Sequence, residues 1–471
     1  KVVIKLTGHT VYKLYINGNF VLHGPAKTAH SYWRVDELEI NKYLTQESNT
    51  VSILVGGYYC YSYAYTGQPS FLCAEITCSS EVIAATGDFG FNAYFYKDGN
   101  IYDLDGNISY PNSLYIAHPI KLKKMSNKGR VLVTGATGYI GSHTIVELIG
   151  AGYEVVGVDN FHNSSPSVLK SIEQIVGKPI PFIELDCSDK KDFERVFEQY
   201  PDITSAIHFA AYKAVGESVS KPIDYFRNNL QSLINLIELS FEKTGKGAIV
   251  FSSSCTVYGE PDPENLPIRE DAPVKEATSP YGRTKQMCEE ILKDSTKAYP
   301  WLKAIALRYF NPIGAHPSAI IGEMPTGVPQ NLVPFITQTA AGLRNELKIW
   351  GNDYDTPDGT CIRDYIYVCD LAKAHVAAVN RLLNCTDSDN FEIFNVGTGR
   401  GLSVLELVKC FIKTTSVELP YSFAQRREGD IVKVWADPTK ANQVLGWKGE
   451  TPIEEILLSA WNWEKKVRGI K

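Results

Sequence analysis

The sequence predicts an α/β protein, a doubly wound parallel sheet with a smaller α/β domain, preceded by a separate all-β sandwich. Three observations carry this prediction. The first 83 residues alternate with period two, a strand, glycine-rich turn and helix follow at 131–149, and strands then alternate with helical patterns. A chain of 471 residues, 44% of them hydrophobic, exceeds one ordinary domain. We expect a sandwich with a linker at 1–124, a doubly wound domain at 125–310, and a smaller domain at 311–471 with some chain crossing back.

Composition argues against several classes of function. The formal net charge is −6 and no stripe of Lys and Arg occurs, which argues against a nucleic-acid partner. Because no run of 18 apolar residues is present, we expect no membrane partner. The ten cysteines form no C-x-x-C pair and no Cys/His cluster. This pattern predicts reduced thiols, a cytoplasmic location and no metal site.

The N-terminal region is predicted to consist of strands joined by turns. Residues 11–22 are typical of a β-hairpin whose turn is Asn17-Gly18, and residues 50–56 and 71–78 look like further strands. Because no helical period accompanies them, the region is interpreted as a sandwich. Residues 98–124 are rich in turn formers and predict a linker. Met125 then looks like the start of an independent protein, as in a fusion of two units.

Several short motifs follow one another in this region, namely Tyr15-Ile-Asn-Gly18, Gly24-Pro25, Tyr32-Trp33, Leu44 and the strand at 51–55. Together they resemble the jelly-roll accessory module of bacterial α-L-rhamnosidases. The resemblance implies a carbohydrate-associated fold. It makes four aromatic residues candidates for stacking on sugar rings, although packing within the sandwich is the simpler explanation: Trp33, Tyr61, Tyr63 and Tyr65.

The stretch at 131–142 reads Val-Leu-Val-Thr-Gly-Ala-Thr-Gly-Tyr-Ile-Gly-Ser. Its β-branched run predicts a strand, and its three glycines predict a tight turn into a helix over 140–149. Glycine lets the backbone approach a ligand closely, and the free amides of a helix N-terminus attract a pyrophosphate. A second strand ends in Asp159, whose carboxylate would accept from ribose hydroxyls and repel a 2′-phosphate. The stretch therefore predicts a Rossmann domain that binds NAD.

Further strands end near this turn. The strand at 181–186 ends in Asp186, a candidate contact for the adenine, and the strand at 205–211 ends in small residues. A helix near 229–243 precedes the strand at 248–254, which ends in serines. In such a sheet, ligands bind at the carboxyl ends of the strands.

Tyr281 and Lys285 are spaced to project from one face of a helix that starts after Pro280. A tyrosine of pKa about 10 is a poor base at neutral pH. A nearby ammonium and a positive nicotinamide ring would favour the phenolate. We therefore expect Tyr281 to act as the acid–base group and Lys285 to lower its pKa.

Long runs of sequence place the region from Arg130 to about Trp463 beside a known family. They are Leu-Val-Thr-Gly-Ala-Thr-Gly-Tyr-Ile-Gly-Ser-His (132–143), Lys-Ala-Val-Gly-Glu-Ser (213–218), Phe-Ser-Ser-Ser (251–254), Ser-Pro-Tyr-Gly (279–282), Arg-Tyr-Phe-Asn-Pro-Ile-Gly-Ala-His-Pro (308–317) and Arg-Arg-Glu-Gly-Asp (426–430). The region resembles the UDP-galactose 4-epimerases of the extended short-chain dehydrogenase/reductase family. The resemblance implies NAD as cofactor, a UDP-sugar as substrate and a homodimer.

The family pattern implies roles for individual residues. Tyr281 would be the base and acid at the sugar 4-hydroxyl, Lys285 would bind the nicotinamide ribose, and Ser254 would hydrogen-bond the same hydroxyl. The cofactor would also be held by Gly135, Gly138, Tyr139, Ile140, Gly141, Asp159, Asn160, Asn163, Ser164, Asp186, Cys187, Phe209, Ala210, Lys213, Asn228 and Phe310. The UDP-sugar would be held by Lys213, Ser254, Thr256, Tyr281, Asn311, Asn331, Leu332, Trp350, Arg363, Arg427, Asp430 and Val434.

Three departures from the family pattern bear on the cofactor and sugar pockets. Phe-Ala-Ala-Tyr-Lys at 209–213 replaces the usual Gly-Leu before the lysine, and Cys255 stands where alanine is usual. At Val434 some members have a tyrosine that closes the sugar pocket and others a small cysteine. A valine leaves volume near C2 of the sugar, so we hypothesise that UDP-GlcNAc and UDP-GalNAc are also accepted.

The resemblance implies a mechanism in which C4 is oxidised, the 4-keto sugar turns over, and the hydride returns to the opposite face. Two alternatives stay open. A sugar-nucleotide 4,6-dehydratase or decarboxylase needs an extra acid or base after the serine, where this chain has Cys255 and Thr256. A carbohydrate-binding protein with an inactive epimerase unit is disfavoured by the intact serine, tyrosine and lysine.

Overall fold

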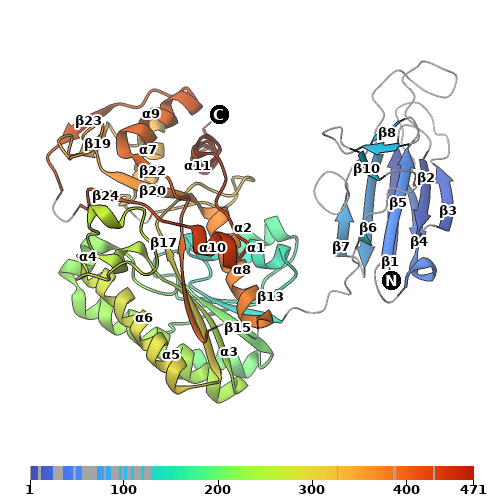
Figure 1. The fold of residues 1–471 in the computed structure, drawn as a ribbon, viewed down its shortest axis with the longest axis horizontal. Helices are drawn as coiled ribbons and strands as arrows, with labels where there is room; N and C mark the ends of the chain where they lie inside the picture. Colours follow the sequence, from blue (N-terminus) through green and yellow to red (C-terminus); the bar gives the residue numbers. More distant parts are fainter. Residues whose placement is uncertain are drawn as a thin grey trace. The chain divides into compact units, whose positions relative to one another are not determined.

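The protein is described from a computed structural model. The described residues are 2–8, 12–17, 19–24, 35–45, 49–55, 72–78, 81–85, 95–97, 100–102, 108–110, 119–120, 129–325, 327–385, 389–427 and 430–470. The chain divides into two compact units, Lys1–Ser126 and Asn127–Lys471 (Figure 1). The aromatic candidates at positions 33, 61, 63 and 65, and most of the expected linker, lie outside the described residues.

The N-terminal unit is built from antiparallel strands. One sheet has the order β4-β1-β6-β7, a second β11-β5-β2-β3, and a third β10-β9-β8. Their bounds are β1 (Val2–Gly8), β2 (Tyr12–Ile16), β3 (Asn19–Gly24), β4 (Asp36–Glu39), β5 (Asn49–Val55), β6 (Leu72–Cys78), β7 (Glu81–Ala85), β8 (Phe95–Lys97), β9 (Asn100–Tyr102), β10 (Ile108–Tyr110) and β11 (Pro119–Ile120), with one 3-10 turn at Asn41–Tyr43.

Apolar side chains of the first two sheets share one core. Leu6 of β1 and Ile76 of β6 lie in the same buried cluster as Leu14 of β2 and Val51 of β5. The predicted hairpin is present, because β2 pairs antiparallel with β3 and the turn residue Asn17 has a positive φ of 50°. The period-two pattern therefore arises because one face of each sheet packs on the other sheet.

The second unit contains a seven-stranded sheet in the order β14-β13-β12-β15-β16-β17-β21, in which every pair is parallel. Buried aliphatic runs such as Val131–Val133 form its centre, as expected for strands covered on both faces. The bounds are β12 (Arg130–Thr134), β13 (Glu154–Asp159), β14 (Phe182–Glu184), β15 (Ile203–His208), β16 (Gly247–Ser252), β17 (Leu302–Tyr309) and β21 (Phe391–Val396).

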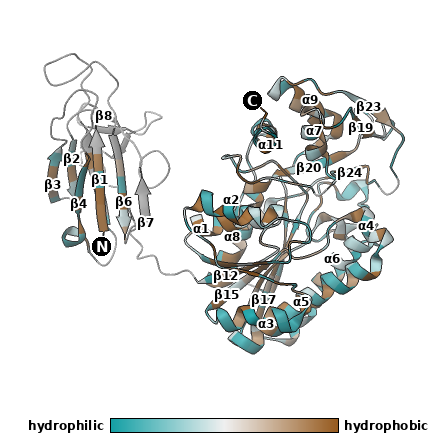
Figure 2. Cartoon of the chain, turned by 180° about the vertical axis from the view of Figure 1, so that it is seen from behind, coloured by the Kyte–Doolittle hydropathy of each residue, from teal (hydrophilic) through white to brown (hydrophobic). Residues whose placement is uncertain are grey.

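Helices cover both faces of this sheet (Figure 1). Two buried clusters mark the two faces: one joins Ile145 and Leu371 to the strands, and the other joins Phe193, Leu236 and Leu292 to them. In Figure 2 the strands β12, β15 and β17 are coloured as hydrophobic. The helices are α1 (Tyr139–Gly150), α2 (Ser167–Val176) and α8 (Val368–Asn384) on one face, and α3 (Lys190–Gln199), α5 (Pro222–Thr244) and α6 (Pro280–Ala298) on the other, with α4 (Val215–Ser220) beside α6.

The chain after residue 310 forms a smaller layer and also returns to the large sheet. Strand β21 pairs with β17 and α8 packs on α1, so the expected crossing back is present. A third buried cluster includes Ile336, Leu407 and Trp461. The other elements are β18 (Asn311–Ile313), β19 (Leu347–Trp350), β20 (Ile362–Tyr367), β22 (Gly401–Ser403), β23 (Tyr421–Ala424), β24 (Lys433–Val434), α7 (Leu332–Ala340), α9 (Val404–Thr415), α10 (Thr439–Val444) and α11 (Ile453–Arg468), with 3-10 turns at Cys255–Tyr258 and Pro263–Asn265.

The predicted fold class is confirmed: a doubly wound parallel sheet follows small antiparallel sheets. We retain the division of the second unit near residue 310 as a proposal. In the part of the chain that the structure describes, no helix combines the length and apolarity that a bilayer crossing requires.

Candidate active site

The turn between β12 and α1 is a cradle that only glycine permits. A Cβ on Gly141 would lie 2.2 Å from the carbonyl oxygen of Gly135, and one on Gly135, at φ +68°, would lie 2.9 Å from the amide of Ala210. Gly138 caps helix α1 without a side-chain capping hydrogen bond. This end of the helix therefore presents backbone amides and its positive dipole to an anion. The cradle fits the pyrophosphate of a dinucleotide.

Asp159, at the end of β13, is fixed by three donors. Its carboxylate accepts from the amide of Thr137 at 3.0 Å, the amide of Phe161 at 2.9 Å and the hydroxyl of Ser164 at 3.3 Å. Thr137, which sequence reasoning missed, also bonds Ser164 at 2.7 Å between hydroxyl oxygens. The structure thus ties the predicted ribose acid to the glycine turn.

The other predicted cofactor residues lie on two sides of this turn, after β13 and β14 on one side and after β15 on the other. On the adenine side, the amide of Asn160 donates to Asp186 at 3.2 Å, whereas Cys187 is buried in the core beneath. On the β15 side, the amide of Ala210 donates to Thr134 at 3.1 Å. The remaining candidates on this edge are Asn163, exposed on the β13 loop, Lys213, also exposed, Phe209, which packs on His375, and Asn228, which bonds Asn229.

Tyr281 and Lys285 project from the first turns of α6 toward the end of β16, as their spacing predicts. Both side chains are buried, at 8% and 4% exposure. Tyr281 hydrogen-bonds Ser254, whose hydroxyl also accepts from Thr256 at 3.0 Å. The Lys285 ammonium donates to the carbonyl oxygen of Ser252 at 2.7 Å and lies 5.9 Å from the centroid of the Tyr281 ring. The structure thus brings together the three predicted catalytic residues.

The chain's own residues supply only one of the two positive charges that were expected to acidify the phenol, because the nicotinamide ring belongs to the cofactor. Burial raises the pKa of Tyr281 well above its ordinary value, and the hydrogen bond from Ser254 only partly offsets this. Burial also lowers the pKa of Lys285 to about 8. The surroundings of Tyr281 within the chain therefore favour its neutral phenol, with burial as the main cause.

A buried ion pair that sequence reasoning missed holds this helix in place. Glu289, two turns after Tyr281 on α6, accepts from the guanidinium of Arg308 on β17 at 2.5 Å and from the hydroxyl of Ser253 at 2.5 Å. The Arg308 guanidinium also lies over the ring of Tyr258, 4.6 Å from its centroid. The carboxylate thus joins α6 to the two strands that end at the site.

Three predicted substrate residues meet in one small sheet. Asn311 of β18 pairs with Tyr365 of β20, and Arg363 of β20 pairs with Val434 of β24. Val434 is 3% exposed and shares a buried cluster with Phe310. We call this sheet the wall; its strand β18 begins directly after Phe310, which follows the end of β17.

The remaining substrate candidates lie at the surface. Asn331 precedes α7, whose first residue is Leu332, and its amide donates to Glu323 at 2.5 Å. Arg427 pairs with Asp430 at 2.6 Å while remaining 59% exposed, and Trp350 is 47% exposed at the end of β19. Sequence reasoning missed Glu323, whose pKa is raised by burial. No local spacing signal announced it.

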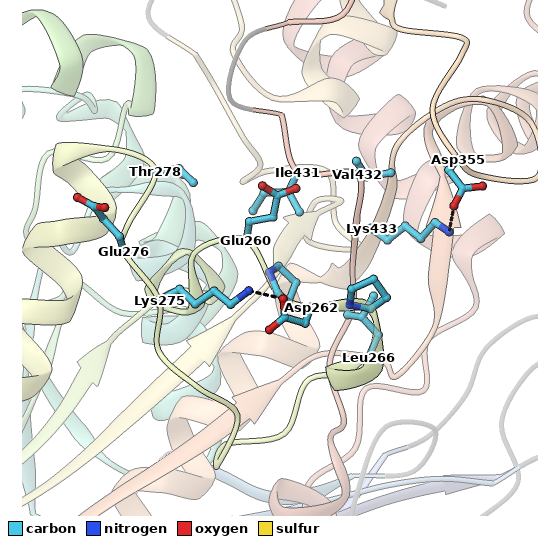
Figure 3. Close-up of a pocket in the computed structure, with 12 residues that line it drawn as sticks. Glu260, Asp262, Leu266, Lys275, Glu276, Thr278, Asp355, Ile431, Val432 and Lys433 are labelled. Atoms are coloured by element: carbon cyan, nitrogen blue, oxygen red, sulfur yellow. Dashed lines mark hydrogen bonds and ion pairs between the residues drawn. The ribbon is translucent and has the colours of Figure 1, made fainter.

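A cavity of about 650 Å³ opens beside this wall (Figure 3). Loop residues before α6, among them Lys275 and Thr278, line one side, and residues around β24 line the other. Two ion pairs join lining residues: Lys275 pairs with Asp262 at 2.6 Å, and Lys433 pairs with Asp355 at 3.6 Å. Ser254, Tyr281 and Lys285 are not among the residues that line this cavity, so it is distinct from the predicted catalytic site.

A dinucleotide cradle beside a buried Ser–Tyr–Lys group on a doubly wound sheet defines an NAD-dependent enzyme of the dehydrogenase type. Residues 131–397 match the NAD dependent epimerase/dehydratase family. The UDP-glucose 4-epimerase of Bacillus subtilis is 50% identical over 343 residues, which cover 72% of this chain and 98% of that protein. The chain belongs to the NAD dependent epimerase/dehydratase family.

Solved structures agree with this membership. A crystal structure of UDP-glucose 4-epimerase from Bifidobacterium longum in complex with NAD+ and UDP is 46% identical with a TM-score of 0.68, covering 73% of this chain and 100% of that one. The UDP-Glc/GlcNAc 4-epimerase of Campylobacter jejuni is 35% identical with a TM-score of 0.61, covering 72% and 99%. The predicted resemblance to 4-epimerases is confirmed for the second unit.

The cradle generates a first prediction. Gly141→Ala places a Cβ against the carbonyl of Gly135, so the turn must open and the helix must shift. We expect the purified variant to retain less than a tenth of the NAD that the wild type carries. Gly150→Ala, where a Cβ meets nothing within 4 Å, is the control and should retain wild-type NAD. Equal NAD content in both variants would contradict the cradle, as measured by mass spectrometry of the released nucleotide.

Proposed function

We propose that the second unit interconverts UDP-glucose and UDP-galactose as a UDP-glucose 4-epimerase that uses NAD. The observation that carries the proposal is the buried triplet of Ser254, Tyr281 and Lys285 beside the glycine cradle. The identity of 50% with the Bacillus subtilis 4-epimerase supports the choice of reaction within the family. When bound, NAD supplies the hydride acceptor that oxidises C4 of the sugar and then returns the hydride.

The chain's own residues move the proton and hold the substrate. Tyr281 takes the proton of the 4-hydroxyl and gives it back, with Ser254 bonded to the same phenol. Because burial raises the pKa of that phenol, ionisation depends on positive charge nearby, which Lys285 and the nicotinamide ring supply together. Arg363 and Arg427 suit a diphosphate, since a planar guanidinium donates in pairs.

The remaining assignments from the family pattern are part of the same proposal. Asn331 and Leu332 would hold the UDP portion of the substrate, and Trp350 would also contact the substrate. Binding free energy would then come mainly from the part of the substrate that does not react, which leaves the 4-keto sugar free to turn over. The rival 4,6-dehydratase reading remains disfavoured, because Cys255 and Thr256 supply neither the extra acid nor the extra base.

The second prediction tests the acid–base role. In an assay that couples UDP-glucose formation from UDP-galactose without added NAD, Tyr281→Phe should lower turnover by about 10²–10⁴-fold, since proton transfer is lost. Tyr299→Phe, at the exposed far end of the same helix, is the matched control and should keep its rate within about twofold. A Tyr281→Phe enzyme within tenfold of wild type would refute the assignment. Bound NAD without turnover in the wild type would favour an inactive, carbohydrate-binding unit.

A wider substrate range is supported by Val434. The valine lies in the wall, in the same buried cluster as Phe310, and is smaller than the tyrosine of some family members. We infer that the pocket admits an N-acetyl group at C2, so that UDP-GlcNAc and UDP-GalNAc are also interconverted. The named range of the Campylobacter jejuni enzyme shows that this family fold accommodates both types of sugar.

The third prediction follows from the volume at this position. Val434→Tyr should lower turnover of UDP-GlcNAc at least tenfold while UDP-galactose stays within about threefold, because only the larger sugar needs the space. Val434→Cys keeps the position small and serves as the control for both substrates. Undetectable turnover of UDP-GlcNAc by the wild type would end the hypothesis.

We also propose a homodimer and a cytoplasmic location. Helices α4–α6 carry apolar side chains at the surface, with Val219 64%, Ile223 63% and Met287 36% exposed. Such side chains favour an interface between two copies. The buried Cys187, Cys288, Cys361 and Cys369 are free thiols, which favours a reducing compartment.

The fourth prediction concerns this apolar face. Ile223→Glu combined with Val219→Glu should convert the dimer into a monomer, because two buried charges would face each other across the interface. Leu343→Glu, 53% exposed after α7, controls for added charge and should remain dimeric. Sedimentation equilibrium measures the mass, and a double variant that stays dimeric at micromolar concentration would argue against this face.

A further inference from the structure

Two loops on either side of the glycine turn meet through a pair of rings. His162, from the loop after β13, lies against Tyr212, from the loop after β15, with ring centroids 4.6 Å apart and planes inclined by 33°. Strand β12 lies between β13 and β15 in the sheet. The rings therefore join the two loops that flank the central strand.

The register places this contact over the end of β12. Thr134, the last residue of β12, is level with Val158 on one side and His208 on the other. His162 comes four residues after Val158, and Tyr212 comes four residues after His208. Because neighbouring strands lie about 4.8 Å apart, β13 and β15 are separated by about twice that distance. Because the two rings touch, they must lie over the carboxyl end of β12, where the cradle Gly135–Gly141 begins.

Both loops are held firmly behind the rings. On one side, Tyr212 exchanges two hydrogen bonds with Asn229, at 2.8 and 3.1 Å, and its ring packs edge-on to Tyr225 at 5.5 Å. On the other, the amide of His162 donates to Asn160 at 3.0 Å, and the preceding Phe161 packs on Phe182. The ring contact is thus a bridge between two anchored loops.

We propose that His162 and Tyr212 form a clasp over the dinucleotide groove and slow the release of NAD. The groove that a dinucleotide would follow crosses the carboxyl end of the central strand, from the Asp159 side to the Lys285 side. The clasp spans this crossing, so the cofactor leaves only after the rings part. Tyr212 is one of the two residues, with Ala211, by which this chain departs from the family pattern before Lys213. This proposal depends on NAD occupying the cradle. It does not depend on which sugar is epimerised.

The test measures NAD exchange in the full-length holoenzyme without substrate. Bound NAD is chased with an excess of isotopically labelled NAD, and the retained nucleotide is analysed by mass spectrometry after rapid desalting. His162→Ala and Tyr212→Leu should each release NAD about three- to tenfold faster, in line with the loss of an aromatic pair. His162→Phe and Tyr212→Phe retain a ring and should stay within twofold of wild type.

The combined variant separates a clasp from two independent effects. His162→Ala with Tyr212→Leu should release NAD no faster than the quicker single variant, because one contact is lost once. Unchanged rates in both ring-less variants, ring-retaining variants as fast as the ring-less ones, or multiplied effects in the double variant would each overturn the proposal. His162 is exposed, so its variants carry the test even where Tyr212→Leu does not fold. Because release is measured without turnover, an inactive enzyme would refute the proposed function and leave this result intact.

Discussion

The carboxylate of Glu289 is the interaction on which the catalytic geometry depends. It is 6% exposed and binds Arg308 of β17 and Ser253 at the end of β16 while standing on α6. Removing one partner of a buried ion pair typically costs about 3–5 kcal/mol, because the other charge remains buried and unpaired. Helix α6 therefore has one register against the sheet. This register places Tyr281 and Lys285 beside Ser254, and a displacement of about 1 Å at such a site can cost about 10²-fold in rate.

A second buried carboxylate fixes the position of the small sheet that carries Asn311, Arg363 and Val434. Asp364 of β20 accepts from Thr398, Gly399 and Ala436, at distances between 2.7 and 3.2 Å. It thus joins β20 to the turn after β21 and to the residues that follow β24. The neighbouring Arg363 and Val434 are therefore fixed relative to the large sheet. The two halves of the site are each held by one desolvated charge whose hydrogen bonds are satisfied.

The sequence predicted what is local and missed what is assembled from distant strands. The glycine turn, Asp159 and the pair Tyr281 and Lys285 follow from short spacings that fix their positions on one strand end or one helix face. Glu289 and Asp364 find their partners on other elements, and no spacing within α6 or β20 announces such pairs. The effect of burial on the pKa of Tyr281 could not be predicted for a related reason: the proximity of a charge can be read from the i and i+4 spacing, whereas desolvation depends on the whole packed core.

The reaction explains why such a site would benefit from a closed cofactor groove. Epimerisation returns NAD to its starting oxidation state within each turnover, so cofactor exchange contributes nothing to the cycle. A dehydrogenase, by contrast, must release its reduced cofactor each time. The substrate side has the opposite requirement, because product must leave. Arg427 and Trp350, which we propose hold the substrate, are half exposed. The proposed site therefore combines a buried catalytic group held by an ion pair and two bridged cofactor loops with an exposed end for the nucleotide. Such an arrangement would confine exchange to the substrate and product, while NAD stays bound.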